Sequence, residues 1–271
     1  MAFITGGARG QGRSHAVRLA QEGADIALLD ACQDVSTAGY AMARLGDLEA
    51  TAEMVRALGR RVVAVQADVR DQPALDAAVA ETVATLGAID IVCANAGVAS
   101  FARTWELTDE QWRDVIDIDL TGVWRTIKAV VPSMLEADRG GSIVLTSSAG
   151  GIQGIQNFSH YVAAKHGVIG LMKTLANEVA AHRIRVNAVV PGTVLTEMAV
   201  NEPAMRLFRP DLAHPTLDDV REAMQSMHAI PVPWLEPVDV SNAILWLSSD
   251  EARYVTGVVL PIDAGWINKS F

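Results

Sequence analysis

Short apolar segments alternate with longer amphipathic ones along most of the chain. Seven short segments contain many β-branched residues and predict strands, at Ala2–Thr5, Asp25–Leu29, Val62–Gln66, Ile89–Ala94, Ser142–Thr146, Arg185–Val190 and Val258–Ile262. The longer segments predict helices, at Ser14–Glu22, Leu48–Leu58, Pro73–Leu86, Asp109–Leu135, Phe158–Ala181 and Val238–Leu247. Strands that alternate with helices predict right-handed crossovers between parallel strands.

This pattern predicts an α/β fold of the Rossmann type, with a doubly wound, mostly parallel sheet of seven strands and helices on both faces. No internal repeat, low-complexity tract or linker separates the segments. We therefore expect one domain over residues 1–271.

Two connections are longer than this alternation requires. Residues 31–47 follow the second strand as an insertion, which is either tolerated or functional. Residues 193–237 contain six of the ten prolines and only a weak helix signal, at Leu217–Met227. Because long irregular segments in compact domains are often lids, we expect residues 193–237 to cover a substrate.

Composition and charge exclude several classes of partner. Half of the residues are hydrophobic, and 32 acidic against 22 basic residues give a net charge of −10. No cluster of Lys and Arg offers a footprint for nucleic acid. The apolar runs are too short to cross a membrane, no secretory signal precedes the first strand, and the two cysteines form no metal-binding pattern. We therefore expect a cytoplasmic protein that binds neither metal, membrane nor nucleic acid.

A glycine-rich segment from Thr5 to Gly12 lies between the first strand and the first helix. Gly6, Gly10 and Gly12 allow a dinucleotide pyrophosphate to approach the backbone at the helix N-terminus. Asp30 ends the next strand, where a carboxylate binds ribose hydroxyls and repels a 2′-phosphate. Arg9 in the loop would favour a cofactor with a 2′-phosphate, but the Asp30 carboxylate is expected to lie closer to the 2′ position and to decide the preference. The segment predicts NAD as the cofactor.

Tyr161 and Lys165 stand four residues apart on a predicted helix, with Ser148 thirteen residues upstream. Side chains at this spacing lie on one helical face, so the ammonium is expected beside the phenol. A free tyrosine has a pKa of about 10, and lowering it by about 2–3 takes roughly 3–4 kcal/mol of charge stabilisation. Such a phenol acts as a general base, toward which Ser148 orients a substrate oxygen.

Together these residues resemble the short-chain dehydrogenase/reductase family. The family's motifs occur in the family's order along nearly the whole chain, as Thr5-Gly-x-x-x-Gly-x-Gly12, Asp30, Asp68-Val69, Asn95-Ala-Gly97, Ser148, Tyr161-x-x-x-Lys165, Pro191-Gly192 and Thr196. The resemblance implies that Tyr161 is the acid/base, that Lys165 binds the nicotinamide ribose and lowers the pKa of Tyr161, and that Ser148 orients the alcohol or carbonyl. It also implies an NAD site made of Gly6, Arg9, Gly10, Gln11, Gly12, Asp30, Asp68, Val69, Asn95, Ala96, Gly97, Tyr161, Lys165, Pro191, Val194 and Thr196.

The insertion and the expected lid are similar to those of the carveol dehydrogenase group within this family. The similarity extends to residues 9–15, 121–125 and 206–212. It implies oxidation of a secondary, alicyclic or terpenoid alcohol, an NAD that does not exchange readily, and reoxidation by an external, mycofactocin-type redox carrier. The C-terminal segments Tyr254–Gly257 and Asp263–Gly265 resemble a family segment between subunits, which implies a homotetramer.

One residue departs from the family pattern. Asp119 occupies a position where the family has an asparagine that supports a water relay to the lysine. An ionised Asp119 beside Lys165 would raise the pKa of Tyr161. Alternatively, the backbone carbonyl alone holds the water and the side chain has no effect. We include Asp119 among the candidate catalytic residues, with Ser148, Tyr161 and Lys165.

The substrate is predicted less directly than the reaction. Apolar residues that border the site in relatives suit an alicyclic alcohol, namely Val98, Ile152, Phe158, Met198 and Phe208. A steroid or a 3-hydroxyacyl substrate on the same scaffold is the alternative. A regulator that senses NAD without catalysis is a further alternative, although such a protein needs only the cofactor loop and not Ser148, Tyr161 and Lys165.

Overall fold

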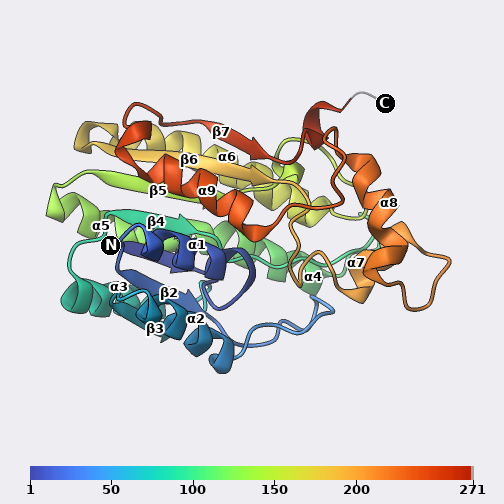
Figure 1. The fold of residues 1–271 in the computed structure, drawn as a ribbon, viewed down its shortest axis with the longest axis horizontal. Coiled ribbons are helices and arrows are strands. Elements are labelled where there is room, and N and C mark those ends of the chain that lie inside the picture. The colour runs from blue at the N-terminus through green and yellow to red at the C-terminus, as the bar shows by residue number, and fades with distance from the viewer. Residues whose placement is uncertain (270–271) are drawn as a thin grey trace.

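The computed structural model describes residues 1–269. Seven parallel strands form one sheet in the order β3-β2-β1-β4-β5-β6-β7 (Figure 1). Their bounds are β1 Ala2–Thr5, β2 Ile26–Asp30, β3 Val62–Gln66, β4 Ile91–Ala94, β5 Gly141–Thr146, β6 Ile184–Pro191 and β7 Val259–Ile262. The predicted fold class is confirmed, and each predicted strand is found within two residues of its expected position.

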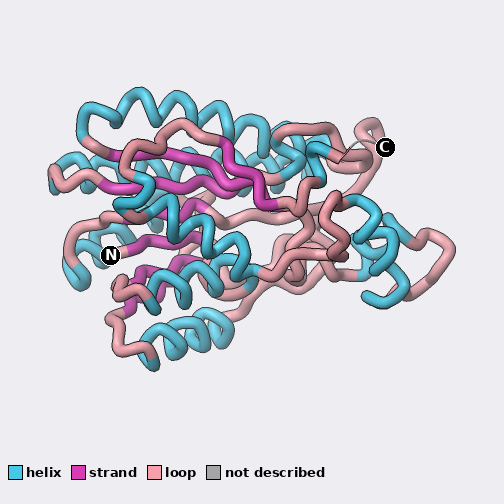
Figure 2. The backbone as a smooth tube through the Cα atoms, turned by 45° about the horizontal axis from the view of Figure 1, so that its top comes forward, coloured by secondary structure: helices cyan, strands magenta, loops and turns pink. Residues whose placement is uncertain are grey.

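Two helical layers cover the sheet (Figure 2). One layer contains α1 Gly10–Gln21, α2 Leu45–Ala57 and α9 Pro237–Ser248, which pack against one another and share an apolar core with the sheet. The other contains α3 Gln72–Leu86, α4 Asp109–Ile116, α5 Gly122–Ala137 and α6 Ser159–Val179. Burial on both faces explains why the central strands are apolar almost throughout.

The expected single helix over residues 109–135 is interrupted. A π-helical segment, Asp117–Thr121, separates α4 from α5 and contains the buried Asp119. Such wide turns occur often at functional sites. Gly122, directly after this segment, packs so closely against Val69 that a Cβ at this position would lie 2.5 Å from Cγ2 of Val69.

The two long connections extend beyond the carboxyl ends of the strands, on the right of Figure 1. The insertion is irregular from Ala31 to Arg44, and α2 begins at Leu45. The candidate lid contains α8 at Leu217–Met227, as predicted, and a second helix, α7, at Glu202–Phe208. Sequence analysis missed α7 because it has only two turns and carries Pro203 in the first one.

Two features are absent from the described residues 1–269. None of the helices there combines the length and the apolar character needed to cross a membrane. In the same residues, no group of three or more His, Cys, Asp or Glu side chains is arranged to hold a metal ion.

Candidate active site

The glycine-rich segment joins β1 to α1 at the carboxyl edge of the sheet. Gly6 has a φ of +66°, which favours glycine, and a Cβ there would lie 2.8 Å from Cα of Ala96. A Cβ at Gly12 would lie 2.0 Å from the carbonyl oxygen of Gly6. The first N–H groups of α1 have no partner within the helix and are available to an anion. This cradle of bare backbone fits a dinucleotide pyrophosphate.

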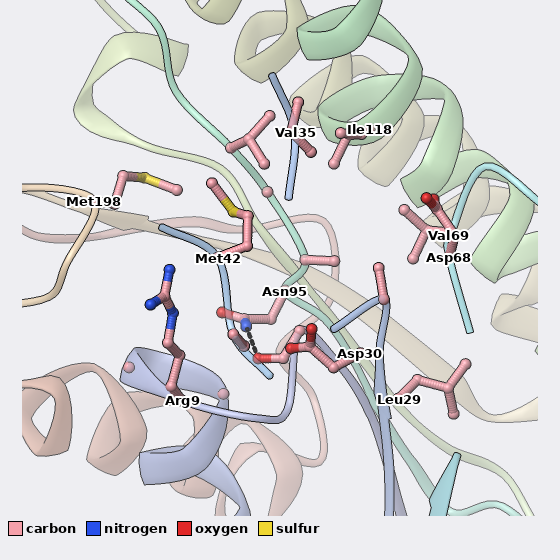
Figure 3. A pocket seen from close by; sticks show the side chains of 18 of the residues that line it. Arg9, Leu29, Asp30, Val35, Met42, Asp68, Val69, Asn95, Ile118 and Met198 are labelled. Carbon is pink, nitrogen blue, oxygen red and sulfur yellow. Dashed lines mark hydrogen bonds between the residues drawn. The ribbon is translucent and has the colours of Figure 1, made fainter. Parts of the chain in front are cut away.

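A cavity beside this loop collects most of the predicted cofactor residues (Figure 3). It runs along the ends of β1, β2 and β4, the central strands of the sheet. The predicted residues that line it are Gly6, Arg9, Gly10, Gln11, Gly12, Asp30, Asp68, Val69, Asn95, Ala96, Gly97 and Thr196, together with the substrate candidates Val98 and Met198.

Asp30 and Arg9 lie on different sides of this cavity (Figure 3). The Asp30 carboxylate accepts hydrogen bonds from the backbone N–H groups of Ala8, at 3.1 Å, and Cys32, at 3.0 Å. Each of its oxygens keeps a lone pair for a ribose hydroxyl. Arg9 donates to the carbonyl oxygen of Ala41 in the insertion, at 2.6 Å, and its Nε lies 4.0 Å from Glu197. Arg9 therefore joins the insertion to the lid side of the cavity.

Asp68 depends on Arg70, a residue that sequence analysis did not select. Arg70 donates to both carboxylate oxygens of Asp68, at 2.7–3.1 Å, and lies 3.3 Å from Asp114. Burial opposes ionisation of Asp68, but the bonds from Arg70 keep the pKa of the carboxyl below its usual value. Asp114 also accepts a 2.7 Å bond from Thr37 of the insertion. The part of the cavity near Asp68 is thus connected to the insertion.

Sequence analysis also missed the part of the insertion that enters the cavity. Val35, Tyr40, Met42 and Ala43 line it. The Tyr40 hydroxyl accepts a 3.3 Å bond from the N–H of Ala99, and burial raises the pKa of Tyr40. Tyr40 is the only aromatic residue of the insertion, which is a weak signal that the sequence did contain.

Helix α6 carries Tyr161 and Lys165 on one face, as their spacing predicted. Lys165 Nζ lies 5.3 Å from the centroid of the Tyr161 ring and donates to the carbonyl oxygen of Thr146, at the end of β5, at 3.1 Å. Ser148 follows β5, its hydroxyl accepts a 3.2 Å bond from the N–H of Gly150, and it lies close enough to the Tyr161 phenol to lower the pKa of that group. The structure therefore brings Ser148, Tyr161 and Lys165 together next to Gly97, which lines the cofactor cavity.

Asp119 forms a buried ion pair with Lys165. Its Oδ2 lies 3.1 Å from Lys165 Nζ, and its Oδ1 accepts a 2.8 Å bond from the N–H of Val98. The side chains of Asp119 and Lys165 are 0% and 3% exposed. A Cβ at Gly97 would lie 2.9 Å from Asp119 Oδ2 and 3.4 Å from Lys165 Nζ, so the absent side chain of Gly97 makes room for the pair.

The buried environment changes the expected ionisation of Tyr161. Burial raises the pKa of Tyr161 above its ordinary value; Lys165 and the Ser148 hydroxyl lower it, and Asp119 raises it further. Lys165 therefore lowers the pKa of Tyr161 as expected, but burial outweighs this effect, so the expected net fall below the ordinary value is wrong. Burial also raises the pKa of Asp119, and Lys165 only partly opposes this. Burial disfavours the Lys165 ammonium, but Asp119 and Tyr161 raise its pKa overall.

Other predicted residues lie outside the cavity lining. Pro191 ends β6, and the buried Val194 bridges to Leu235. Ile152 is exposed, and Phe208 ends α7 in the candidate lid. Phe158 packs against the Tyr161 ring, with centroids 4.7 Å apart.

The fold and these motifs define a class of dinucleotide-binding proteins, and comparison with known proteins identifies its family. A family model described as enoyl-(acyl carrier protein) reductase matches residues 6–267. The chain belongs to the short-chain dehydrogenase/reductase family of oxidoreductases.

Within the family, the chain is similar to carveol dehydrogenases. It is 53% identical to (-)-trans-carveol dehydrogenase of Rhodococcus erythropolis, over 98% of this chain and 96% of the relative. The crystal structure of carveol dehydrogenase from Mycobacterium avium in complex with NAD is 55% identical, with a TM-score of 0.97 and coverage of 99% and 97%. A short-chain dehydrogenase from Mycobacterium paratuberculosis bound to NAD is 42% identical, with a TM-score of 0.89 and coverage of 99% and 97%.

Proposed function

We propose that this protein oxidises a secondary alcohol to a ketone with NAD as hydride acceptor. The observation that carries the proposal is the convergence of Ser148, Tyr161 and Lys165 beside the dinucleotide cavity. Two similar proteins of known structure contain NAD, and the bare-backbone cradle and Asp30 of this chain fit the same cofactor. A shared fold does not by itself specify an activity. A hydroxyl, a phenol and an ammonium gathered at one site support an acid/base reaction more directly.

In the proposed reaction, the Tyr161 phenolate removes the hydroxyl proton of the alcohol. Ser148 donates a hydrogen bond to the substrate oxygen as it becomes a carbonyl oxygen. Lys165, held by Asp119 and by the carbonyl oxygen of Thr146, supplies the positive charge that favours the phenolate. Bound NAD supplies the hydride acceptor. Reduction of a ketone uses the same residues in the opposite direction.

We propose an alicyclic, carveol-like alcohol as the substrate. The apolar residues Val98 and Met198 line the cavity. The test is reduction of NAD, followed by absorbance, with carveol, a 3-hydroxysteroid and a 3-hydroxyacyl thioester. Fastest turnover of carveol supports the proposal, and preference for either of the others replaces it with that substrate class. No reduction with any secondary alcohol, despite bound NAD, favours an NAD-sensing regulator.

We propose that NAD remains bound between turnovers and is reoxidised by an external, mycofactocin-type carrier. Residues of the insertion line the cavity, among them Val35, Tyr40 and Met42. The Arg9–Ala41 and Thr37–Asp114 hydrogen bonds hold the insertion in place. We expect NAD(H) in stoichiometric amount in the supernatant after the purified protein is denatured. An artificial electron acceptor is then expected to sustain turnover without added NAD. A cofactor-free preparation that turns over only with added NAD contradicts retention.

Asp119→Asn is expected to change the pH dependence of alcohol oxidation. The rate rises with pH as Tyr161 ionises, and the Asp119 carboxylate raises the pKa of Tyr161. Its removal is expected to move the acid limb of the kcat profile to lower pH by about one unit, and to raise the rate below that limb by up to about tenfold. Asp117→Asn, in the same π-helical segment but exposed, is the matched control. An unchanged profile means that the Asp119 side chain does not set the strength of the base.

We propose that the chain assembles as a homotetramer. The C-terminal segment that resembles a family contact between subunits carries Tyr254, whose side chain is 89% exposed in the isolated chain. Sedimentation equilibrium measures the mass of the assembly directly, and a monomer contradicts the proposal.

A further inference from the structure

A stack of three aromatic rings ends at the candidate catalytic tyrosine. Phe101, in the connection between β4 and α4, stacks on Phe158, with centroids 4.7 Å apart and planes at 4°. Phe158, the residue that precedes α6, packs in turn against Tyr161, with centroids 4.7 Å apart and planes at 35°. Residues three apart at the start of a helix are neighbours on its surface, which explains the second contact but not the first.

The segment that carries Phe101 is fixed by the residues next to it. The Ser100 hydroxyl lies 2.8 Å from Nε2 of His160, and both residues are buried. The N–H of Ala102 donates to the carbonyl oxygen of Asn157, at 3.1 Å. The residues on both sides of Phe101 therefore form hydrogen bonds with residues near the start of α6. Its ring has a defined position from which to support Phe158.

Asn157 directly precedes Phe158. Its φ is +64°, in the left-handed region, which asparagine adopts more readily than other residues with a side chain. An asparagine at this position therefore suits the turn of the backbone that leads into α6.

The ring of Tyr161 is enclosed on more than one side. Phe158 covers it on one side, and the turn at Gly150 approaches its Cδ1–Cε1 edge, where an added Cβ would lie 3.6 Å away. The titratable and polar groups that act on the phenol are Lys165 from α6, Asp119 from the π-helical segment, Ser148 after β5 and Tyr40 from the insertion. Tyr161 as a whole is 8% exposed.

We propose that Phe158, supported by Phe101, is a positioning residue for Tyr161. The Phe158 ring fixes the plane of the phenol relative to Ser148 and Lys165 and excludes water from that side. This inference rests on the proposed function, in which Tyr161 is the acid/base. Stacked aromatic pairs have a preferred geometry, and an aliphatic side chain of similar volume does not reproduce it. Small displacements of a catalytic group have large effects on rate.

The test compares Phe158→Leu and Phe101→Leu with Phe101→Tyr, which keeps a ring in the stack. For Phe158→Leu we expect the pH-independent kcat to fall about tenfold, with little change in bound NAD or in KM for the alcohol. Water then reaches the phenol, so the pKa of Tyr161 falls and the acid limb of the profile moves to lower pH. Phe101→Leu is expected to lower kcat and to shift the acid limb in the same direction, but by less. Phe101→Tyr is expected to behave like the parent.

Trp105→Leu, which removes a 78% exposed ring from the same connection, is the control for loss of an aromatic residue.

A second measurement is independent of turnover. The ultraviolet difference spectrum between the parent and Tyr161→Phe reports ionisation of Tyr161 without substrate. The same difference spectrum is then taken between Phe158→Leu and the double variant Phe158→Leu/Tyr161→Phe, and we expect ionisation of Tyr161 at lower pH. Thermal unfolding shows that each variant is folded. A raised KM with unchanged kcat and unchanged titration makes Phe158 a wall of the substrate site and overturns the proposal. If the parent reduces no NAD with any alcohol while the titration still shifts, the proposed function fails and the positioning contact stands.

Discussion

Tyr161→Phe is expected to abolish most alcohol oxidation while leaving NAD in place. The phenylalanine ring retains the packing against Phe158 and the position above Lys165, so only the hydroxyl is removed. General acid–base catalysis contributes about 10²–10⁴-fold to a rate, and we expect kcat to fall by that factor. The measurement is NADH formation in single turnover, together with the amount of NAD(H) released on denaturation.

Tyr254→Phe is the control, because it removes the same hydroxyl from a residue of the C-terminal segment that belongs neither to the cavity nor to the catalytic group. Its rate is expected to equal that of the parent. A Tyr161→Phe protein with nearly parental kcat would show that another group transfers the proton. Loss of bound NAD in this variant would instead indicate that Tyr161 contributes mainly to cofactor binding.

Lys165→Met is expected to be the most destabilising substitution in the site. It leaves the Asp119 carboxylate fully buried with only the N–H of Val98 as a partner. Breaking a buried ion pair by removing one partner costs about 3–5 kcal/mol of unfolding free energy. The measurement is denaturant unfolding at several pH values, in parallel with alcohol oxidation, which we expect to be lost.

The loss of stability in Lys165→Met is expected to depend on pH in a defined direction. Burial already raises the pKa of Asp119, and removal of the ammonium that opposes this raises it further. A carboxyl whose pKa is higher in the folded state than in the unfolded state binds more protons when folded. The unfolding free energy of Lys165→Met is therefore expected to fall as pH rises from the unfolded pKa of about 4 to neutrality.

Two variants separate charge from packing in this experiment. Lys165→Met combined with Asp119→Asn removes both charges, so we expect most of the stability to return and its pH dependence to vanish, without recovery of activity. Lys173→Met makes the same exchange at an exposed position of α6 and is expected to be stable and active. Equal stability of the single and the double variant at neutral pH would show that Asp119 is not ionised once Lys165 is removed.

The sequence predicted the scaffold well because its signals are local. Short apolar runs rich in β-branched residues identified the seven strands, and longer amphipathic segments identified most helices. The alternation of strands and helices implied the parallel order. The helix α7 and the π-helical interruption at Asp117–Thr121 were missed. The first is too short to have a pattern, and the second depends on packing, including the close approach of Gly122 to Val69.

The candidate site divides in the same way. The sequence by itself determined the glycine cradle, Asp30 and the Tyr161–Lys165 pair, because each depends on spacing within one element or one turn. Only the tertiary structure decided that Asp119 neutralises Lys165, that Arg70 holds Asp68, and that Tyr40 enters the cavity. It also decided the pKa of Tyr161, since burial outweighs the neighbouring ammonium. Contacts between distant segments and the loss of water around a charge are properties of the folded chain, and no local pattern encodes them.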